Sequence, residues 1–173
     1  MLYEKFIRLV EDHAEKLTKL WVEEVQNNPS TRGYRKINDA LLEKRVYDVY
    51  KRLGRWLLNE DITFKETAEH YMKLGSERAH EGIQLSEVIY AIVISRLVLW
   101  NYVINQGIVN SIFEHHQALE FLQRVTTYFD KAIYFISIGY ENSSKADQEK
   151  IKKSDFIEKS VNAVTKWIIK DVK

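Results

Sequence analysis

Residues 78–100 read RAHEGIQLSEVIYAIVISRLVLW, and this stretch decides the fold. A short polar turn at Gly82 leads into a segment that is apolar on nearly every side from Leu85 to Ile104. A helix on the surface of a protein carries one apolar stripe, so we expect this helix to be enclosed by other helices. The sequence therefore predicts an all-α fold, a helical bundle around a buried central helix.

The composition fits one such domain. The 173 residues suffice for a sizeable core, and a single proline with six glycines favours long helices. The 26 basic and 25 acidic residues leave a net charge of +1, which attracts neither nucleic acid nor an anionic membrane. The absence of cysteine excludes disulfides and thiolate sites and fits a reducing compartment. We expect a cytoplasmic protein with no nucleic-acid partner and no membrane partner.

Amphipathic periodicity predicts further helices around the central one. Asn38 or Asp39 can cap the second, Thr63 with Glu66 forms a capping box for the third, and Gly82 ends the third. The expected segments are helices at 6–25, 39–57, 64–81 and 116–140 and a polar loop at 30–36.

The expected helix at 116–140 carries two apolar seams. The first comprises Leu119, Leu122, Thr126, Phe129, Ile133, Ile136 and Tyr140, and the second comprises Phe121, Val125, Tyr128, Ala132, Phe135 and Gly139. A helix packed against one core needs one seam, so the second predicts a homodimer, although a helix between two layers of its own domain has the same pattern. The candidate interface residues are Leu122, Phe129, Ile133 and Ile136, or Phe121 and Tyr128.

Beyond Tyr140 the sequence becomes highly charged. The run ENSSKADQEKIKKSD, residues 141–155, contains one large apolar residue, Ile151. An amphipathic segment at 156–168 follows it. We therefore expect a helical sensor domain at 1–140, and at 141–173 a long C-terminal arm, formed by a charged linker and a terminal amphipathic helix.

No catalytic motif is present, so we expect no enzyme activity. The pair Glu77 and His80 is a single Glu-x-x-His, whereas a di-metal bundle needs two, so we expect no metal. Haem is the alternative cofactor, with His70 or His80 as the axial ligand. Both histidines lie in charged surroundings rather than on an apolar face, so we expect no cofactor.

Two charged features lie within or beside the apolar stretch. Arg96 is predicted to be buried, and it then needs an Asp or Glu from a neighbouring helix, or an anionic ligand or a partner protein. Arg78 with Glu81 or Glu87 can fix the turn at Gly82 or act as a switch there. The candidate ligand or partner contacts are Arg78, Glu87, Arg96 and Trp100.

These residues also carry a family resemblance. The matching positions are Arg78, Gly82, Leu85, Ser86, Glu87, Arg96 and Trp100, the aromatic helix with Tyr128-Phe129-Asp130 and Gly139-Tyr140, and Trp21. In this pattern the chain resembles the N-terminal domain of RsbR and RsbRD-type stress-signalling proteins. The resemblance implies a globin-like fold without haem and a dimeric, non-enzymatic sensory input domain. Related domains precede some bacterial histidine kinases, which implies a downstream signalling protein or a fused output module as partner.

Overall fold

The computed structural model describes residues 2–58, 64–106, 112–144, 159, 160 and 162. Its elements are the helices α1 (Leu2–Asp12), α2 (Ala14–Asn27), the 3₁₀-helix η1 (Pro29–Lys36), α3 (Asp39–Leu57), α4 (Phe64–His80), α5 (Leu85–Asn105) and α6 (Ile112–Ser144). The described residues form no strand, which confirms the expected all-α fold. The globin-like arrangement stays a prediction.

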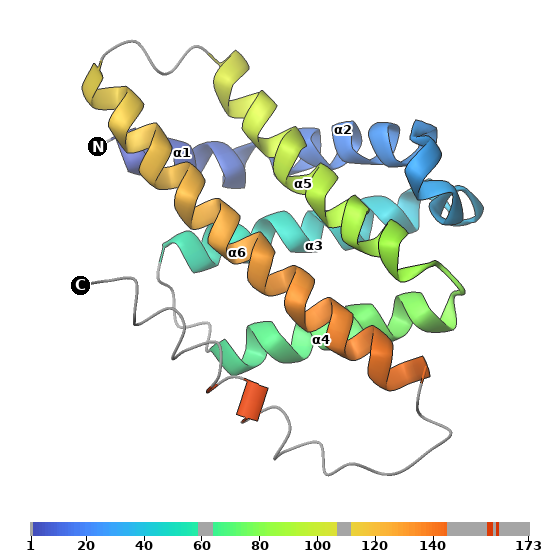
Figure 1. The fold of residues 1–173 in the computed structure, drawn as a ribbon. Coiled ribbons are helices and arrows are strands. Elements are labelled where there is room, and N and C mark those ends of the chain that lie inside the picture. The colour runs from blue at the N-terminus through green and yellow to red at the C-terminus, as the bar shows by residue number, and fades with distance from the viewer. Residues whose placement is uncertain (1, 59–63, 107–111, 145–158, 161, 163–173) are drawn as a thin grey trace.

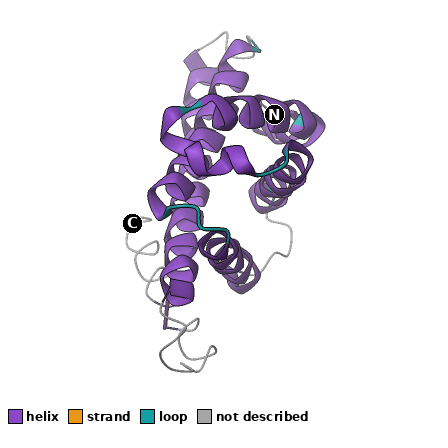
Figure 2. Cartoon of the chain, turned by 90° about the vertical axis from the view of Figure 1, so that its right-hand side faces the viewer, coloured by secondary structure: helices purple, strands orange, loops and turns teal. Residues whose placement is uncertain are grey.

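The helices form two layers. In Figure 1, α5 and α6 lie in front, and α3 and α4 cross behind them. The side view in Figure 2 shows the same two layers edge-on. The core lies between the layers, and its largest fully buried side chains come from both of them: Tyr50, Tyr71, Tyr128, Phe121, Phe129 and Phe135.

Local sequence signals set several helix ends. The Asn38 side chain accepts a hydrogen bond from the Ala40 amide at 2.8 Å and so caps α3, as expected. Gly82 has φ +65°, a left-handed conformation that only glycine adopts without strain, and it separates α4 from α5. The capping box predicted at Thr63 lies outside the described residues.

The N-terminal region differs from the expected single helix and loop. The helix is broken at His13, whose ring Nδ1 lies 2.8 Å from the Tyr102 hydroxyl on α5. The expected polar loop is the helix η1, because Tyr34 is buried there and the Thr31 hydroxyl donates to the Val25 carbonyl at 2.7 Å. In both places a tertiary contact changes the secondary structure that the local sequence pattern predicts.

At the other end, α6 continues to Ser144, so the expected linker at 141 begins inside this helix. Most of 141–173 lies outside the described residues, and with it the predicted terminal amphipathic helix.

The central helix α5 is not enclosed on all sides. Tyr90 is 38% exposed, Leu97 46% and Ile104 52%, whereas Val88 and Leu99 on the opposite face are fully buried. The expectation of a fully buried rod is therefore wrong for one face, because no other described helix covers it. The apolar composition of α5 serves a core on one side and an open surface on the other.

This helix is also long and apolar enough to cross a membrane by length and composition. Of its most apolar 18-residue stretch, 44% is buried inside the domain. The core helix of a soluble protein meets the same criterion, so the composition alone does not make it a membrane span.

Both seams of α6 contribute to the core of the domain. Phe121 and Tyr128 of the second seam are each 1% exposed, and in the first seam Phe129 is 1% and Ile136 0% exposed. These four candidate interface residues are core residues, because α6 packs against α4 on one side and against α1 and α5 on the other. Leu122 and Ile133 are half-buried.

Helices α4 and α6 touch backbone to backbone. A Cβ atom at Gly75 would overlap the carbonyl oxygen of Ile136, and one at Gly139 would overlap that of Met72. Beside these contacts the hydroxyls of Ser76 and Ser143 are hydrogen-bonded. The two helices therefore cross (Figure 1), and at the two glycines their backbones meet directly.

We predict that Gly75→Ala and Gly139→Ala each destabilise the domain by roughly 1–3 kcal/mol or more, because the helices must separate to admit a methyl group. Gly54→Ala is the matched control in α3. There the new methyl group meets the Glu11 side chain, whose Cγ lies 2.9 Å away and must shift, but no backbone atom is in the way, so the loss of stability is smaller than at Gly75 or Gly139. Denaturant unfolding measures all three, and equal stability of the three variants contradicts the prediction.

Candidate functional site

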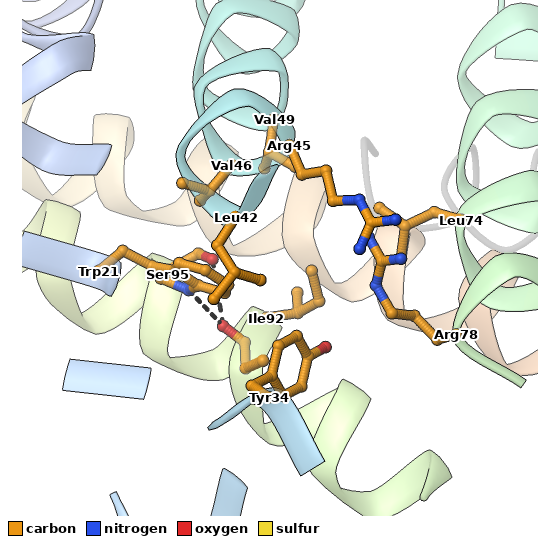
Figure 3. A pocket seen from close by; sticks show the side chains of 11 residues that line it. Trp21, Tyr34, Leu42, Arg45, Val46, Val49, Leu74, Arg78, Ile92 and Ser95 are labelled. Atoms are coloured by element: carbon orange, nitrogen blue, oxygen red, sulfur yellow. Dashed lines mark hydrogen bonds between the residues drawn. The ribbon is translucent and has the colours of Figure 1, made fainter. Parts of the chain in front are cut away.

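A cavity opens between α3, α4 and α5, with α2 and η1 closing one end (Figure 3). Its volume is about 30 Å³, room for one or two water molecules. The lining is mostly apolar, with two arginines grouped on one side. The lining residues are Trp21, Tyr34, Leu42, Arg45, Val46, Val49, Leu74, Arg78, Ala91, Ile92 and Ser95.

The arginines of this cavity share one carboxylate. Arg45 on α3 donates through Nη1 at 3.3 Å and through Nη2 to the two oxygens of Glu81, and Arg78 Nη1 donates to Glu81 Oε2 at 2.9 Å. The Arg78 side chain is 4% exposed and that of Glu81 is 29% exposed. Burial disfavours the charge on Glu81, but the hydrogen bond from Arg45 and the charges of both arginines outweigh it, so its pKa is lowered.

A second carboxylate, that of Glu87, stabilises the end of the turn that follows Glu81. Glu87 accepts hydrogen bonds from the backbone amides of Gly33 at 2.9 Å and of Gln84 at 3.2 Å. Its bond to Gln84 is half of a capping box, and its bond to Gly33 joins α5 to η1. Burial raises the pKa of Tyr34 to about 12, with the neighbouring Arg78 opposing the shift, so this phenol stays neutral.

The same turn is connected to η1 and to the end of α6. The Lys36 ammonium donates to the carbonyl of Glu81 at 2.7 Å. The Tyr140 hydroxyl, in the last turns of α6, donates to the carbonyl of Ile83 at 2.8 Å. Residues 81–83 therefore contact the arginines of the cavity wall through Glu81 and α6 through Ile83.

The cavity wall places two guanidinium groups, both paired with Glu81, beside apolar side chains. Among the described residues, no group of three His, Cys, Asp or Glu side chains could hold a metal ion. The cavity wall contains no nucleophile beside a general base, since its single serine, Ser95, donates to the Ala91 carbonyl. Its distinctive chemistry is a pair of guanidinium groups next to an apolar space.

The four candidate contact residues do not lie together at one site. Arg78 lines the cavity, and Glu87 lies at the adjacent turn. Arg96 is not buried as expected. Its side chain is 28% exposed, because it lies at the edge of α5, and its Nη1 is 3.4 Å from Asp130 on α6, which supplies the acidic partner from a neighbouring helix. Trp100 is half-buried and is not part of the cavity wall.

The two histidines of the haem alternative do not face the cavity. His70 Nε2 lies 3.4 Å from Asp48 Oδ2, and burial together with the charge of Arg52 lowers the pKa of His70 to about 4 despite that carboxylate. His80 is exposed, and its Nδ1 lies 2.8 Å from the Ser76 carbonyl. None of the eleven lining residues is histidine, so this cavity offers haem no axial ligand.

Sequence reasoning missed two residues of the site. Arg45 lies on α3 at the edge of its apolar stripe, and its contact with Glu81 spans 36 residues of sequence. Tyr34 lies in the segment expected to be a solvated loop. Its buried position follows from the packing of η1 against α2 and α5, which periodicity does not show.

We predict that Glu81→Gln lowers the free energy of unfolding at neutral pH and that its difference from the wild type shrinks as the pH falls. The pKa of the Glu81 carboxyl is lower in the folded protein than its ordinary value of 4.5. The ionised carboxylate therefore stabilises the fold fully above pH 4.5, and this stabilisation is lost as acid protonates the carboxylate in the folded protein. Denaturant unfolding at a series of pH values measures this difference.

Glu77→Gln is the matched control for Glu81→Gln. Glu77 also lies near Arg78, but at 4.0 Å and with 45% of its side chain exposed, so its effect is smaller. A Glu81→Gln variant that is as stable as the wild type at neutral pH contradicts the stabilising role of the Glu81 carboxylate.

Comparison with known protein families identifies the family of this chain. No curated protein and no solved structure matches this chain. The family model described as the RsbT co-antagonist protein rsbRD N-terminal domain matches residues 15–146. The match covers most of the chain and includes the cavity and α6, and it confirms the resemblance read from the sequence. The chain therefore belongs to the family of rsbRD N-terminal domains, regulatory domains of stress-response signalling.

Proposed function

We propose that this protein is a non-enzymatic sensory input domain that works as a cytoplasmic homodimer and signals through helix α6. The family supports a regulatory role in stress signalling. The observation that carries the dimer is the open apolar face of α5. The partner that receives the signal is a downstream signalling protein or a fused output module.

Three exposed apolar side chains form a row along one face of α5. They are Tyr90, Leu97 and Ile104. The other large hydrophobic side chains exposed among the described residues are Leu20, Leu41, Tyr47, Leu58, Leu119 and Tyr134. A row of exposed apolar side chains on one helix face is typical of an interface, whereas scattered apolar side chains are normal on any surface.

The spacing on α5 favours a second copy of the chain as the occupant. Its open face carries apolar residues at alternating steps of three and four, namely Tyr90, Val93, Leu97, Trp100 and Ile104. This is the heptad seam that packs against another helix of the same kind. The nearby charge of Arg96 is paired with Asp130, so the face carries no uncompensated charge to repel a second copy. The interface therefore centres on α5 rather than on the two seams of α6.

Leu97→Glu is expected to convert the dimer to a monomer without unfolding it, because the side chain is 46% exposed within one domain. Sedimentation velocity at micromolar concentration measures the mass, and circular dichroism checks the fold. Leu41→Glu, at a side chain 41% exposed on α3, is the matched control and leaves the dimer intact. A wild-type protein that is strictly monomeric contradicts the proposed dimer. Equal effects of both variants contradict the location of the interface on α5.

Signal transmission requires that the end of α6 respond to the turn at 81–83. We expect Tyr140→Phe, which removes the hydrogen bond to Ile83, to cost about 0.5–1.5 kcal/mol and to loosen the end of α6. Because the chain contains no cysteine, a spin label on Asn142→Cys reports this motion by electron paramagnetic resonance.

Tyr134→Phe, on the same helix and 42% exposed, is the matched control for Tyr140→Phe and leaves the spectrum unchanged. An unchanged spectrum in Tyr140→Phe contradicts the proposal that the turn at 81–83 transmits a signal to the end of α6.

A further inference from the structure

The helices α3 and α4 meet mainly through side chains, whereas the backbone of α4 packs closely against α6. The small cavity lies in the seam between α3 and α4, beside α5 (Figure 3). Charged groups bridge this seam at two places. Glu81, just after α4, contacts Arg45 of α3, and His70 of α4 lies beside Asp48 of α3. The seam therefore depends more on the state of a few side chains than on close helix packing.

His70 occupies this seam with a buried nitrogen that has no hydrogen-bond partner. Its Nε2 forms no hydrogen bond with any described residue, although Asp48 Oδ2 lies 3.4 Å away. The same Oδ2 atom accepts a hydrogen bond from Arg52 Nε at 3.0 Å. Buried polar atoms in folded proteins nearly always have partners, so the placement of this imidazole next to an occupied carboxylate is unusual.

The charged groups around His70 disfavour a positive charge on its ring. Asp48 and Arg52 face the ring from α3, and Lys73 adds a second positive charge from α4 itself. Glu66, one turn earlier on α4, is exposed to solvent. Burial, together with the charges of Arg52 and Lys73, outweighs the carboxylate of Asp48, so the pKa of His70 is lowered to about 4.

Two tyrosines connect His70 to α6. The imidazole packs edge-to-face against the ring of Tyr71, with 5.0 Å between the ring centroids. The Tyr71 hydroxyl shares a buried hydrogen bond of 2.7 Å with the hydroxyl of Tyr128 on α6. Burial raises the pKa of both phenols, so α6 faces His70 with a neutral group. A movement of α4 at His70 therefore involves the tyrosine pair that joins α4 to α6.

We propose that His70 makes the seam between α3 and α4 sensitive to acid, and that proton uptake by its imidazole opens the seam at Asp48. An imidazolium in the closed seam lies next to Arg52 and Lys73, whereas in the open seam water hydrates it. Because α4 is joined to α6, opening moves both helices relative to α3. The inference rests on the proposed sensory function, for which it names the proton as the stimulus.

The linkage between proton binding and opening gives the size of the effect. In the open seam His70 has its ordinary pKa of 6.5, and in the closed seam its pKa is about 4. The closed seam is therefore fully favoured above pH 6.5 and loses this advantage about tenfold per pH unit as the pH falls towards 4. Between about pH 7.5 and about pH 5 the ratio of open to closed molecules rises roughly thirtyfold.

A single thiol in the seam measures this ratio even when few molecules are open. The chain contains no cysteine, and Val49→Cys places one on α3 at a buried position in the cavity wall. Dithiodipyridine labels thiols in acid as well as at neutral pH. The labelling rate, divided by that of a free thiol at the same pH, is expected to rise roughly thirtyfold between about pH 7.5 and about pH 5.

Three further variants show whether the rise comes from His70 and from a local opening. His70→Gln in the Val49→Cys protein is expected to reduce the rise to less than about threefold. His80→Gln is the matched control, at an exposed histidine on the same helix, and retains the full rise. Val125→Cys, at a buried position on α6 outside the cavity wall, is expected to label more slowly than Val49→Cys. Equal labelling rates of the two thiols, or a rise that persists in His70→Gln, overturn the proposal.

Two neighbours of His70 are expected to move its titration in opposite directions. Arg52→Gln removes a positive charge and raises the pKa of His70, whereas Asp48→Asn removes a negative charge and lowers it. Both variants break the same ion pair, so its loss alone does not explain opposite shifts. Nuclear magnetic resonance of the histidine rings measures the shifts, with the His70 signal assigned by its absence in His70→Gln. Shifts in the same direction contradict the proposal.

The oligomeric state tests the proposed function separately, because the exposed side chain of Leu97 and the open face of α5 are not part of this seam. A dimer whose thiol labelling does not respond to acid removes the proton as the stimulus and leaves the sensory dimer standing. A monomer with the rise that depends on His70 removes the dimer and supports the acid-sensitive seam.

Discussion

The contact between the backbones of α4 and α6 is the constraint on which the rest of the structure depends. Gly75 and Gly139 allow the two helices to approach without side chains between them. This approach brings Tyr71 of α4 to Tyr128 of α6, where their hydroxyls form a buried hydrogen bond of 2.7 Å. Without the glycines the helices would lie further apart, and the aromatic core around this pair would lose its packing.

The composition of α5 has a different origin from the one that its sequence indicates. A helix that is apolar all round is normally surrounded by its own domain. Here one face packs against α1, α2, η1, α4 and α6, and the other carries a regular apolar seam open to solvent. Periodicity alone cannot distinguish the face of α5 that packs against the core from the face that is open to solvent.

How much can be predicted from the sequence depends on whether the signal is local. Asn38 and Gly82 mark helix ends through their own backbone and side-chain chemistry, and both were predicted. The break at His13 depends on Tyr102, which is 89 residues away, and no local pattern contains it. The same holds for Arg45, whose role follows from the position of Glu81. The burial of both Phe121 and Phe129 follows from the packing of α6 against α1, α3, α4 and α5, and the two seams alone did not distinguish this packing from a dimer.

The hydrogen bond between the Tyr140 hydroxyl and the Ile83 carbonyl joins the end of α6 to the turn between α4 and α5. A single neutral hydrogen bond contributes about 0.5–1.5 kcal/mol, which changes an equilibrium constant by a factor of roughly two to twelve. The backbone contact at Gly139 and the hydrogen bond between Ser76 and Ser143 hold the same end of the helix. Loss of the Tyr140 bond alone therefore has a small, graded effect on the position of this helix end.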